Sequence, residues 1–189
     1  MYHRFGEGKY PSTNIGMKEF KSHIEMIKSE GIKFIHPNNL ESEIKKEKKT
    51  RKALLTIDDG FSSFYNNAWP LLKNQKIPFL LFISTREIGK YNYMTWDQIK
   101  EIHESELGII GNHSDSHEYL IDRSSDEIIS DLKKSKDIFR KNLGENSPYF
   151  SYPFGEYSLE FKEIVKNLGF KFAFGQHSGV IDETKDNLE

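Results

Sequence analysis

The sequence has 189 residues, with 27 Lys or Arg, 29 Asp or Glu and a formal charge of −2 at pH 7. This length suits a single domain over residues 1–189, and the near-zero charge gives no net attraction to nucleic acid or to an anionic membrane. The absence of cysteine excludes disulfides, thiolate zinc sites and cysteine nucleophiles, so any metal must be bound by His and carboxylate side chains.

Short apolar strands alternate with amphipathic helices along the chain. The predicted strands are Tyr2–Phe5, Lys33–His36, Ala53–Ile57, Pro78–Ser84, Gly108–Gly111, Tyr149–Tyr152 and Phe172–Gly175. None of these apolar runs approaches the ~20 residues that a membrane-spanning helix needs, so we expect no membrane span.

Helix signals lie between the predicted strands. Met17 opens a helical period that Gly31 ends, Thr95 and Ser124 each begin a capping box, and Ser158 begins a further helix. The β-α-β-α order predicts parallel strands joined by crossover helices, which fits both an open doubly wound sheet and a closed barrel. In either architecture, functional residues gather at the carboxyl ends of the strands.

The third predicted strand ends in Asp58-Asp59-Gly60. Two adjacent carboxylates after a buried strand are costly without a cation or hydrogen-bond donors. They would point to opposite faces of a regular strand, but the turn at Gly60 can bring both to one pocket. The alternative interpretation is that an Asp caps the helix that follows.

The fifth predicted strand runs into Asn112-His113-Ser-Asp-Ser-His117. Two His residues four positions apart on a helical turn can reach one divalent ion, although surface or capping His residues are the commoner interpretation of this spacing. One Asp and two His would leave open positions for water and substrate, as in a catalytic metal site.

The sixth predicted strand leads into Tyr152-Pro153-Phe154-Gly155. Pro and Gly fix the loop, and its aromatic residues are either a wall against which a sugar stacks or part of the core.

Taken together and in this order, the three motifs resemble those of the polysaccharide deacetylase family, the NodB-homology group of carbohydrate esterases. The resemblance covers nearly the whole chain and implies a distorted (β/α)7 TIM-like barrel, here incomplete at the termini. It implies a hydrolase that removes N-acetyl, or O-acetyl, groups from a glycan containing N-acetylglucosamine and releases acetate.

The resemblance also assigns roles to residues. Asp59, His113 and His117 would bind a divalent metal ion, expected to be Zn²⁺, and Asp58 would be the general base. Tyr152, Pro153 and Phe154 would bind the glycan substrate, and a backbone N–H near Tyr152 would stabilise the oxyanion.

The chain departs from the family pattern at two places. Ser151 stands where the third motif often carries Arg, and the family's late Leu-x-His motif is absent. His177, after the last predicted strand, is therefore the candidate for the catalytic acid, unless the chain is a fragment and the acid lies beyond Glu189. No signal peptide pattern follows Met1, whereas the resemblance favours a periplasmic or secreted location.

Two other functions remain open. A non-catalytic carbohydrate-binding protein would keep the metal site without turnover. A phosphohydrolase would use Asp58 as nucleophile, but that chemistry gives no reason for the His113 and His117 pair and normally uses Mg²⁺ held by oxygen ligands.

Overall fold

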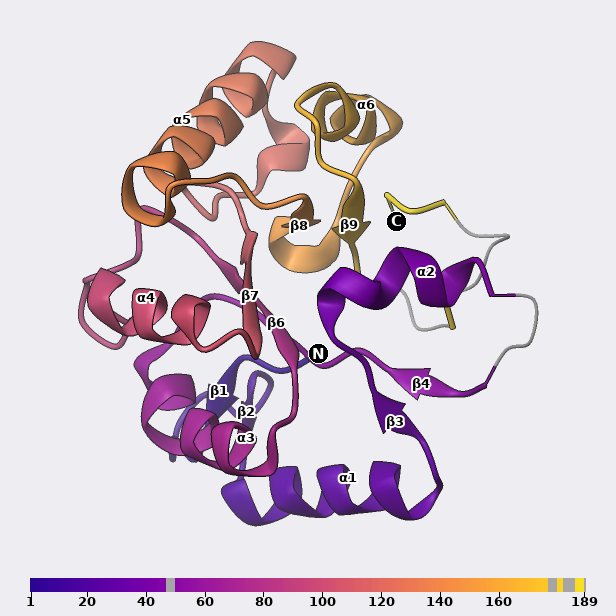
Figure 1. Ribbon diagram of the computed structural model, residues 1–189. Coiled ribbons are helices and arrows are strands. Elements are labelled where there is room, and N and C mark those ends of the chain that lie inside the picture. Colours follow the sequence, from indigo (N-terminus) through magenta and orange to yellow (C-terminus); the bar gives the residue numbers. More distant parts are fainter. Residues whose placement is uncertain (47–49, 177–179, 182–185, 189) are drawn as a thin grey trace. The chain divides into compact units, whose positions relative to one another are not determined.

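The computed structural model describes residues 1–46, 50–176, 180–181 and 186–188 (Figure 1). The chain divides into two compact units. The first comprises Met1–Leu81 and Gly89–Ile109, and the second comprises Phe82–Ile88 and Ile110–Glu189.

The first unit holds two small parallel strand pairs, β1 with β2 and β3 with β4. Its strands are β1 (Arg4–Phe5), β2 (Asn14–Ile15), β3 (Lys33–Phe34), β4 (Lys52–Ala53), β5 (Thr56–Ile57) and the first parts of β6 (Phe79–Ile83) and β7 (Gly108–Asn112). Its helices are α1 (Met17–Ser29), α2 (Leu40–Ile44), α3 (Trp69–Gln75) and α4 (Trp96–Glu104), and a π-helical turn, Phe64–Ala68, leads into α3.

The second unit continues β6 and β7 and adds α5 (Ser125–Leu143), β8 (Tyr149–Ser151), α6 (Leu159–Asn167) and β9 (Phe172–Phe174). Its core lies between α5, α6 and the last two strands (Figure 1). Leu132 of α5, Phe150 of β8 and Val165 of α6 meet there with exposed fractions of zero. The two helices thus turn an apolar face toward the strands.

Strands β5 to β9 form one five-stranded sheet in sequence order. The pairs β5–β6, β7–β8 and β8–β9 are parallel. The predicted α/β class with parallel strands is thus confirmed. The continuous strand predicted over Ala53–Ile57 is wrong: Lys52–Ala53 pairs with β3 and Thr56–Ile57 pairs with β6, because the chain leaves one partner and joins another between them.

The predicted helix starts are confirmed by their caps. Thr95 and Ser124 each accept a hydrogen bond from the backbone three residues on, and Gln98 and Glu127 complete the two capping boxes. Helix α5 ends at Gly144, whose φ of +80° is the left-handed conformation that favours glycine. None of the helices in the described parts of the chain is long and apolar enough to span a membrane.

Candidate active site and metal centre

The acidic pair lies in a tight turn directly after β5. The backbone N–H of Asp58 donates to the carbonyl of Tyr2 (2.8 Å), and the Asp58 side chain is buried. Asp59 and Gly60 then adopt φ values of +74° and +78°. A left-handed Asp is uncommon, and strain of this kind collects at functional sites. Because helical residues begin only at Ser62, neither Asp caps that helix.

His113 lies at the end of β7 in a defined tautomer. Its Nδ1 is 2.7 Å from the carbonyl oxygen of Ser151, the last residue of β8. A carbonyl can only accept a hydrogen bond, so Nδ1 donates to it, and in the neutral ring the lone pair is on Nε2. Metal-binding His residues are held in this way by an outer hydrogen bond that fixes the ring and its tautomer.

His117 approaches His113 through a loop and not through a helix. The predicted helical turn is wrong, since residues 113–117 contain no helical residue and both Ser114 and His117 have positive φ. The N–H of His117 donates to Ser114 Oγ (2.9 Å). The imidazole centroids of His113 and His117 nevertheless lie 4.8 Å apart. The loop therefore achieves the pairing that was expected from helical spacing.

The donor chemistry of the predicted ligands fits a divalent metal ion. Asp59 of the first unit and His113 and His117 of the second each offer one atom that can bind a metal. Two imidazole nitrogens and one carboxylate oxygen match the preference of Zn²⁺ and related transition metals, whereas Mg²⁺ and Ca²⁺ favour all-oxygen sets.

The third motif is divided between core and surface. The Tyr152 side chain is only 1% exposed, and its hydroxyl donates to the carbonyl of Leu188 (3.0 Å). Pro153 is also buried. Both side chains are therefore buried, and the roles of Tyr152 and Pro153 in binding a glycan stay a prediction. The backbone N–H of Tyr152 also has a partner, since it donates to the carbonyl of Phe174 (3.0 Å).

Phe154 is the exposed residue of this motif. Its side chain is 47% exposed and its φ is +60°, so the turn directs the ring outward from buried neighbours. The ring centroid lies 4.9 Å from that of His117 and 5.6 Å from that of Tyr119, which is 41% exposed. Tyr119 was missed in the sequence. Its position two residues after His117 was the available signal.

A buried carboxylate lies within the histidine loop. Asp115 accepts hydrogen bonds from Thr85 Oγ1 (2.7 Å) and Lys134 Nζ (2.6 Å), and Arg86 Nε lies 3.3 Å away. Burial acts to raise the pKa of Asp115, but the hydrogen bonds and charges of these partners outweigh it and hold the pKa below its ordinary value.

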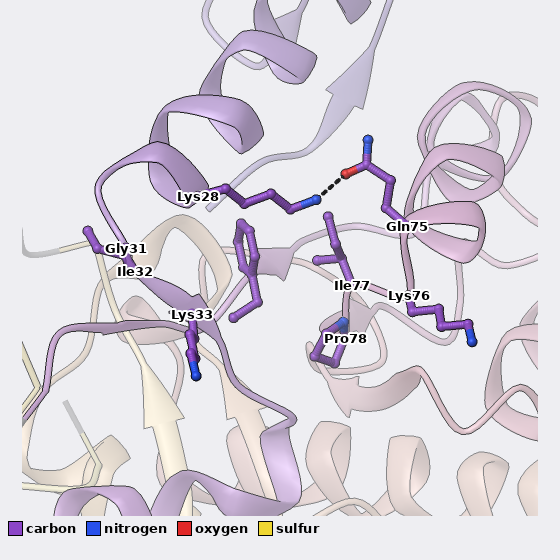
Figure 2. A pocket seen from close by; sticks show the side chains of 9 residues that line it. Lys28, Gly31, Ile32, Lys33, Gln75, Lys76, Ile77 and Pro78 are labelled. Carbon is purple, nitrogen blue, oxygen red and sulfur yellow. Dashed lines mark hydrogen bonds between the residues drawn. The ribbon is translucent and has the colours of Figure 1, made fainter.

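Two features lie elsewhere. His177, the candidate acid, falls outside the described residues. Figure 2 shows a pocket of about 430 Å³ beside the Lys28–Gln75 hydrogen bond. This pocket adjoins the residues that begin β3 and precede β6, whereas the candidate residues follow the strand ends, so it is not part of the site.

Comparison with known proteins decides the family. A family model described as polysaccharide deacetylase matches residues 45–173, more than half of the chain. The chain belongs to the polysaccharide deacetylase family. It is 29% identical over 175 residues to the poly-beta-1,6-N-acetyl-D-glucosamine N-deacetylase of Staphylococcus aureus, covering 85% of this chain and 60% of that protein.

Solved structures of this family share the fold. IcaB from Ammonifex degensii is 26% identical, with a TM-score of 0.86 over 94% of this chain and 82% of that one. The deacetylase PplD of Streptococcus pyogenes, solved with acetate, is 24% identical, with a TM-score of 0.89 over 100% of this chain and 87% of that one. These likenesses confirm the predicted fold class, the (β/α)7 barrel of this family.

Two further comparisons bear on function. The chain spans 60–64% of the length of the curated relatives that it matches in S. aureus and Bacillus subtilis. A CE4 family pseudoenzyme from Bacillus anthracis also matches, at 21% identity and a TM-score of 0.57 over 64% of this chain and 42% of that one.

Proposed function

We propose that this chain is a metal-dependent hydrolase that removes N-acetyl groups from a glycan containing N-acetylglucosamine. The observation that carries the proposal is the His113 imidazole, whose Nδ1 donates to the Ser151 carbonyl, so that in the neutral ring the Nε2 lone pair can bind a metal. A surface or capping His would not need this buried bond to a neighbouring strand.

Asp59, His113 and His117 are the proposed ligands of one divalent ion, with Zn²⁺ as the expected metal. Support comes from their donor chemistry and from their positions after the ends of β5 and β7, which belong to one sheet. Such an ion supplies Lewis-acid polarisation of the acyl carbonyl and lowers the pKa of water in the site.

Asp58 is the proposed general base. Its backbone is fixed by the hydrogen bond to Tyr2, and it directly precedes the proposed ligand Asp59. The Asp58 carboxylate accepts a proton from the attacking water as the C–O bond to the acetyl carbon forms. The C–N bond then breaks, and the departing amine takes up the proton that Asp58 received. Acetate and the free amino sugar leave, and Asp58 is a carboxylate again.

The turn of the third motif contributes the proposed oxyanion and sugar contacts. Because the Tyr152 N–H is bonded to Phe174, the N–H of Phe154 is the better donor to the oxyanion that develops on the acetyl oxygen. The exposed rings of Phe154 and Tyr119, next to His117, give a sugar an apolar face on which to stack.

The substrate class is proposed from the relatives. The S. aureus relative is named as an N-deacetylase of poly-beta-1,6-N-acetyl-D-glucosamine, which favours N-acetyl over O-acetyl removal from a polymer of this sugar. The family membership favours a periplasmic or secreted location, which is part of the proposal.

The alternative is a non-catalytic carbohydrate-binding protein of the same fold. The pseudoenzyme among the structural matches makes this alternative concrete. Glycan binding without acetate release at full metal occupancy would establish this alternative in place of the enzyme.

The test is acetate release from N-acetylglucosamine oligomers by the zinc-loaded chain and by Asp58→Asn. We expect the wild-type chain to release acetate, and the variant to bind zinc normally but lose most of the activity. Asp137→Asn, at an exposed site of α5, is the matched control and should behave as wild type. Equal rates of acetate release by Asp58→Asn and wild type would show that Asp58 is not the general base.

A further inference from the structure

The loop between the two proposed metal ligands has an unusual hydrogen-bond arrangement. The backbone N–H groups of Ser114, Asp115, Ser116 and His117 are consecutive, and all four donate to side-chain oxygens. The acceptors are Asn112 Oδ1 (2.9 Å), Asp131 Oδ1 (2.7 Å), Asp131 Oδ2 (3.1 Å) and Ser114 Oγ (2.9 Å). Side chains therefore replace the backbone partners that a helix or strand would provide.

We propose that Asp131, on α5, is a positioning residue that holds this loop in its metal-binding shape before any metal binds. The inference rests on the proposed function, because it takes His113 and His117 as ligands. Nothing in the motif pattern of the family points to Asp131, which lies 14 residues beyond His117 in the sequence.

The two oxygens of Asp131 share one task. Each accepts a separate N–H from adjacent residues, Asp115 and Ser116, which lie midway between the two His residues. Hydrogen bonds to an ionised carboxylate are shorter and stronger than neutral ones. A neutral amide in place of the carboxylate offers one acceptor oxygen and turns an NH2 group toward the second N–H. One of the two bonds is then lost and replaced by a contact between donors.

The same face of α5 makes two more attachments to the loop. Lys134 and Ser135 follow Asp131 by three and four residues, which places all three on one side of the helix. Lys134 Nζ donates to the buried carboxylate of Asp115 (2.6 Å), and Ser135 Oγ accepts from Asn112 Nδ2 (2.8 Å).

The segment after β6 holds the loop from another side. The N–H of Thr85 donates to the carbonyl of Ser114 (3.2 Å), and the N–H of Arg86 donates to that of Asp115 (3.0 Å). The Thr85 hydroxyl also donates to the Asp115 carboxylate (2.7 Å). The loop is thus fixed by contacts that involve neither imidazole, so its shape does not depend on a bound ion. Asp131 is the member of this set that contacts two backbone groups at once.

The consequence is a preorganised pair of ligands. If the loop relaxed, metal binding would have to bring His117 back to His113. The free energy of that ordering would weaken the affinity for the ion. Loss of an outer partner of a metal ligand typically costs 10–100-fold in metal affinity or activity.

The test compares Asp131→Asn with wild type and with Asp137→Asn, a carboxylate on the same helix that accepts a hydrogen bond from Arg140. Zinc affinity of the metal-free proteins is measured by competition with a chromophoric chelator. The absorption spectrum of the Co²⁺ form reports ligand geometry. We expect the zinc dissociation constant of Asp131→Asn to rise about 10–100-fold, with a changed Co²⁺ spectrum, while Asp137→Asn matches wild type.

Other outcomes separate this inference from the proposed function. If wild type binds zinc and Asp131→Asn binds it equally well with the same Co²⁺ spectrum, the positioning role is wrong and the proposed function stands. If wild type and His113→Ala both fail to bind zinc, the proposed function and the inference fail together.

A second variant covers the case in which Asp131→Asn does not fold. Asp131→Glu keeps the negative charge on α5 but moves the carboxylate oxygens by one methylene length away from the two N–H groups, and Asp137→Glu is its matched control. We expect weaker zinc binding for Asp131→Glu alone, with kcat reduced more than KM is changed. Equal zinc affinity for the two Glu variants would overturn the inference.

Discussion

Gly111, in β7, is a position where a single methyl group tests the packing beneath the proposed metal site. A Cβ added there would lie 2.4 Å and 2.5 Å from two carbons of the Phe82 ring, which is completely buried. Carbon atoms pack at about 3.5–4.0 Å, so the ring would have to retreat by about 1 Å or more. The Phe82 ring also borders His113 and Phe174, at centroid distances of 6.5 Å and 5.3 Å, and the displacement would reach the metal ligand.

We therefore expect Gly111→Ala to lower the free energy of unfolding by about 1–3 kcal/mol, the usual cost of overpacking a core. Urea denaturation with linear extrapolation measures the change. Gly8→Ala is the matched control, because nothing lies within 4 Å of the added Cβ, and it should stay within about 0.5 kcal/mol of wild type.

A double variant identifies the cause. Phe82→Leu removes ring atoms that the new methyl group meets, so Gly111→Ala with Phe82→Leu should be more stable than the sum of the single changes by at least about 0.5 kcal/mol. Two results would refute this packing explanation. One is a loss of unfolding free energy for Gly111→Ala no larger than for Gly8→Ala, and the other is a double variant no more stable than the sum of the single changes.

Three further predictions follow from the site and the helix caps. Phe154→Ala should raise KM for oligomeric N-acetylglucosamine while zinc affinity stays at the wild-type value; an unchanged KM would remove the ring from the sugar contacts. Thr95→Ala should cost about 1 kcal/mol in urea denaturation because α4 loses its cap, and a loss near zero would contradict this. The pKa of Asp115 is held below its ordinary value of 3.8. The ionised carboxylate therefore stabilises the metal-free fold above about pH 3.8, and this stabilisation is lost as the pH falls through the lower pKa of the folded state. Asp115→Asn should lack that acid-dependent loss, and identical pH profiles of unfolding would rule the contribution out.

Local signals predicted the helix boundaries well. Thr95 with Gln98 and Ser124 with Glu127 form the expected capping boxes, and Gly144 ends α5. These features depend on residues three or four positions apart, so the sequence pattern contains the information that they need.

The sequence was less informative where distant contacts decide the structure. Thr56–Ile57 separates from Lys52–Ala53 because the two pairs find different partner strands. His117 reaches His113 through a loop whose N–H groups are accepted partly by Asp131 of α5. Tyr152 is buried in a cluster that includes Leu188, 36 residues later, and its hydroxyl donates a hydrogen bond to the Leu188 carbonyl. No local spacing encodes these contacts. The sequence therefore predicted which residues form the motifs, but it did not predict their backbone conformations or their burial.

The most direct test of the central claim is a titration of the metal-free chain with Zn²⁺ while acetate release from N-acetylglucosamine oligomers is followed. We expect no release without metal, a rate that rises in proportion to added zinc and saturates near one equivalent, and no such rise for His113→Ala. Equal acetate release by the metal-free and zinc-loaded chains, or full activity in His113→Ala, would contradict the assignment of Asp59, His113 and His117 to the metal.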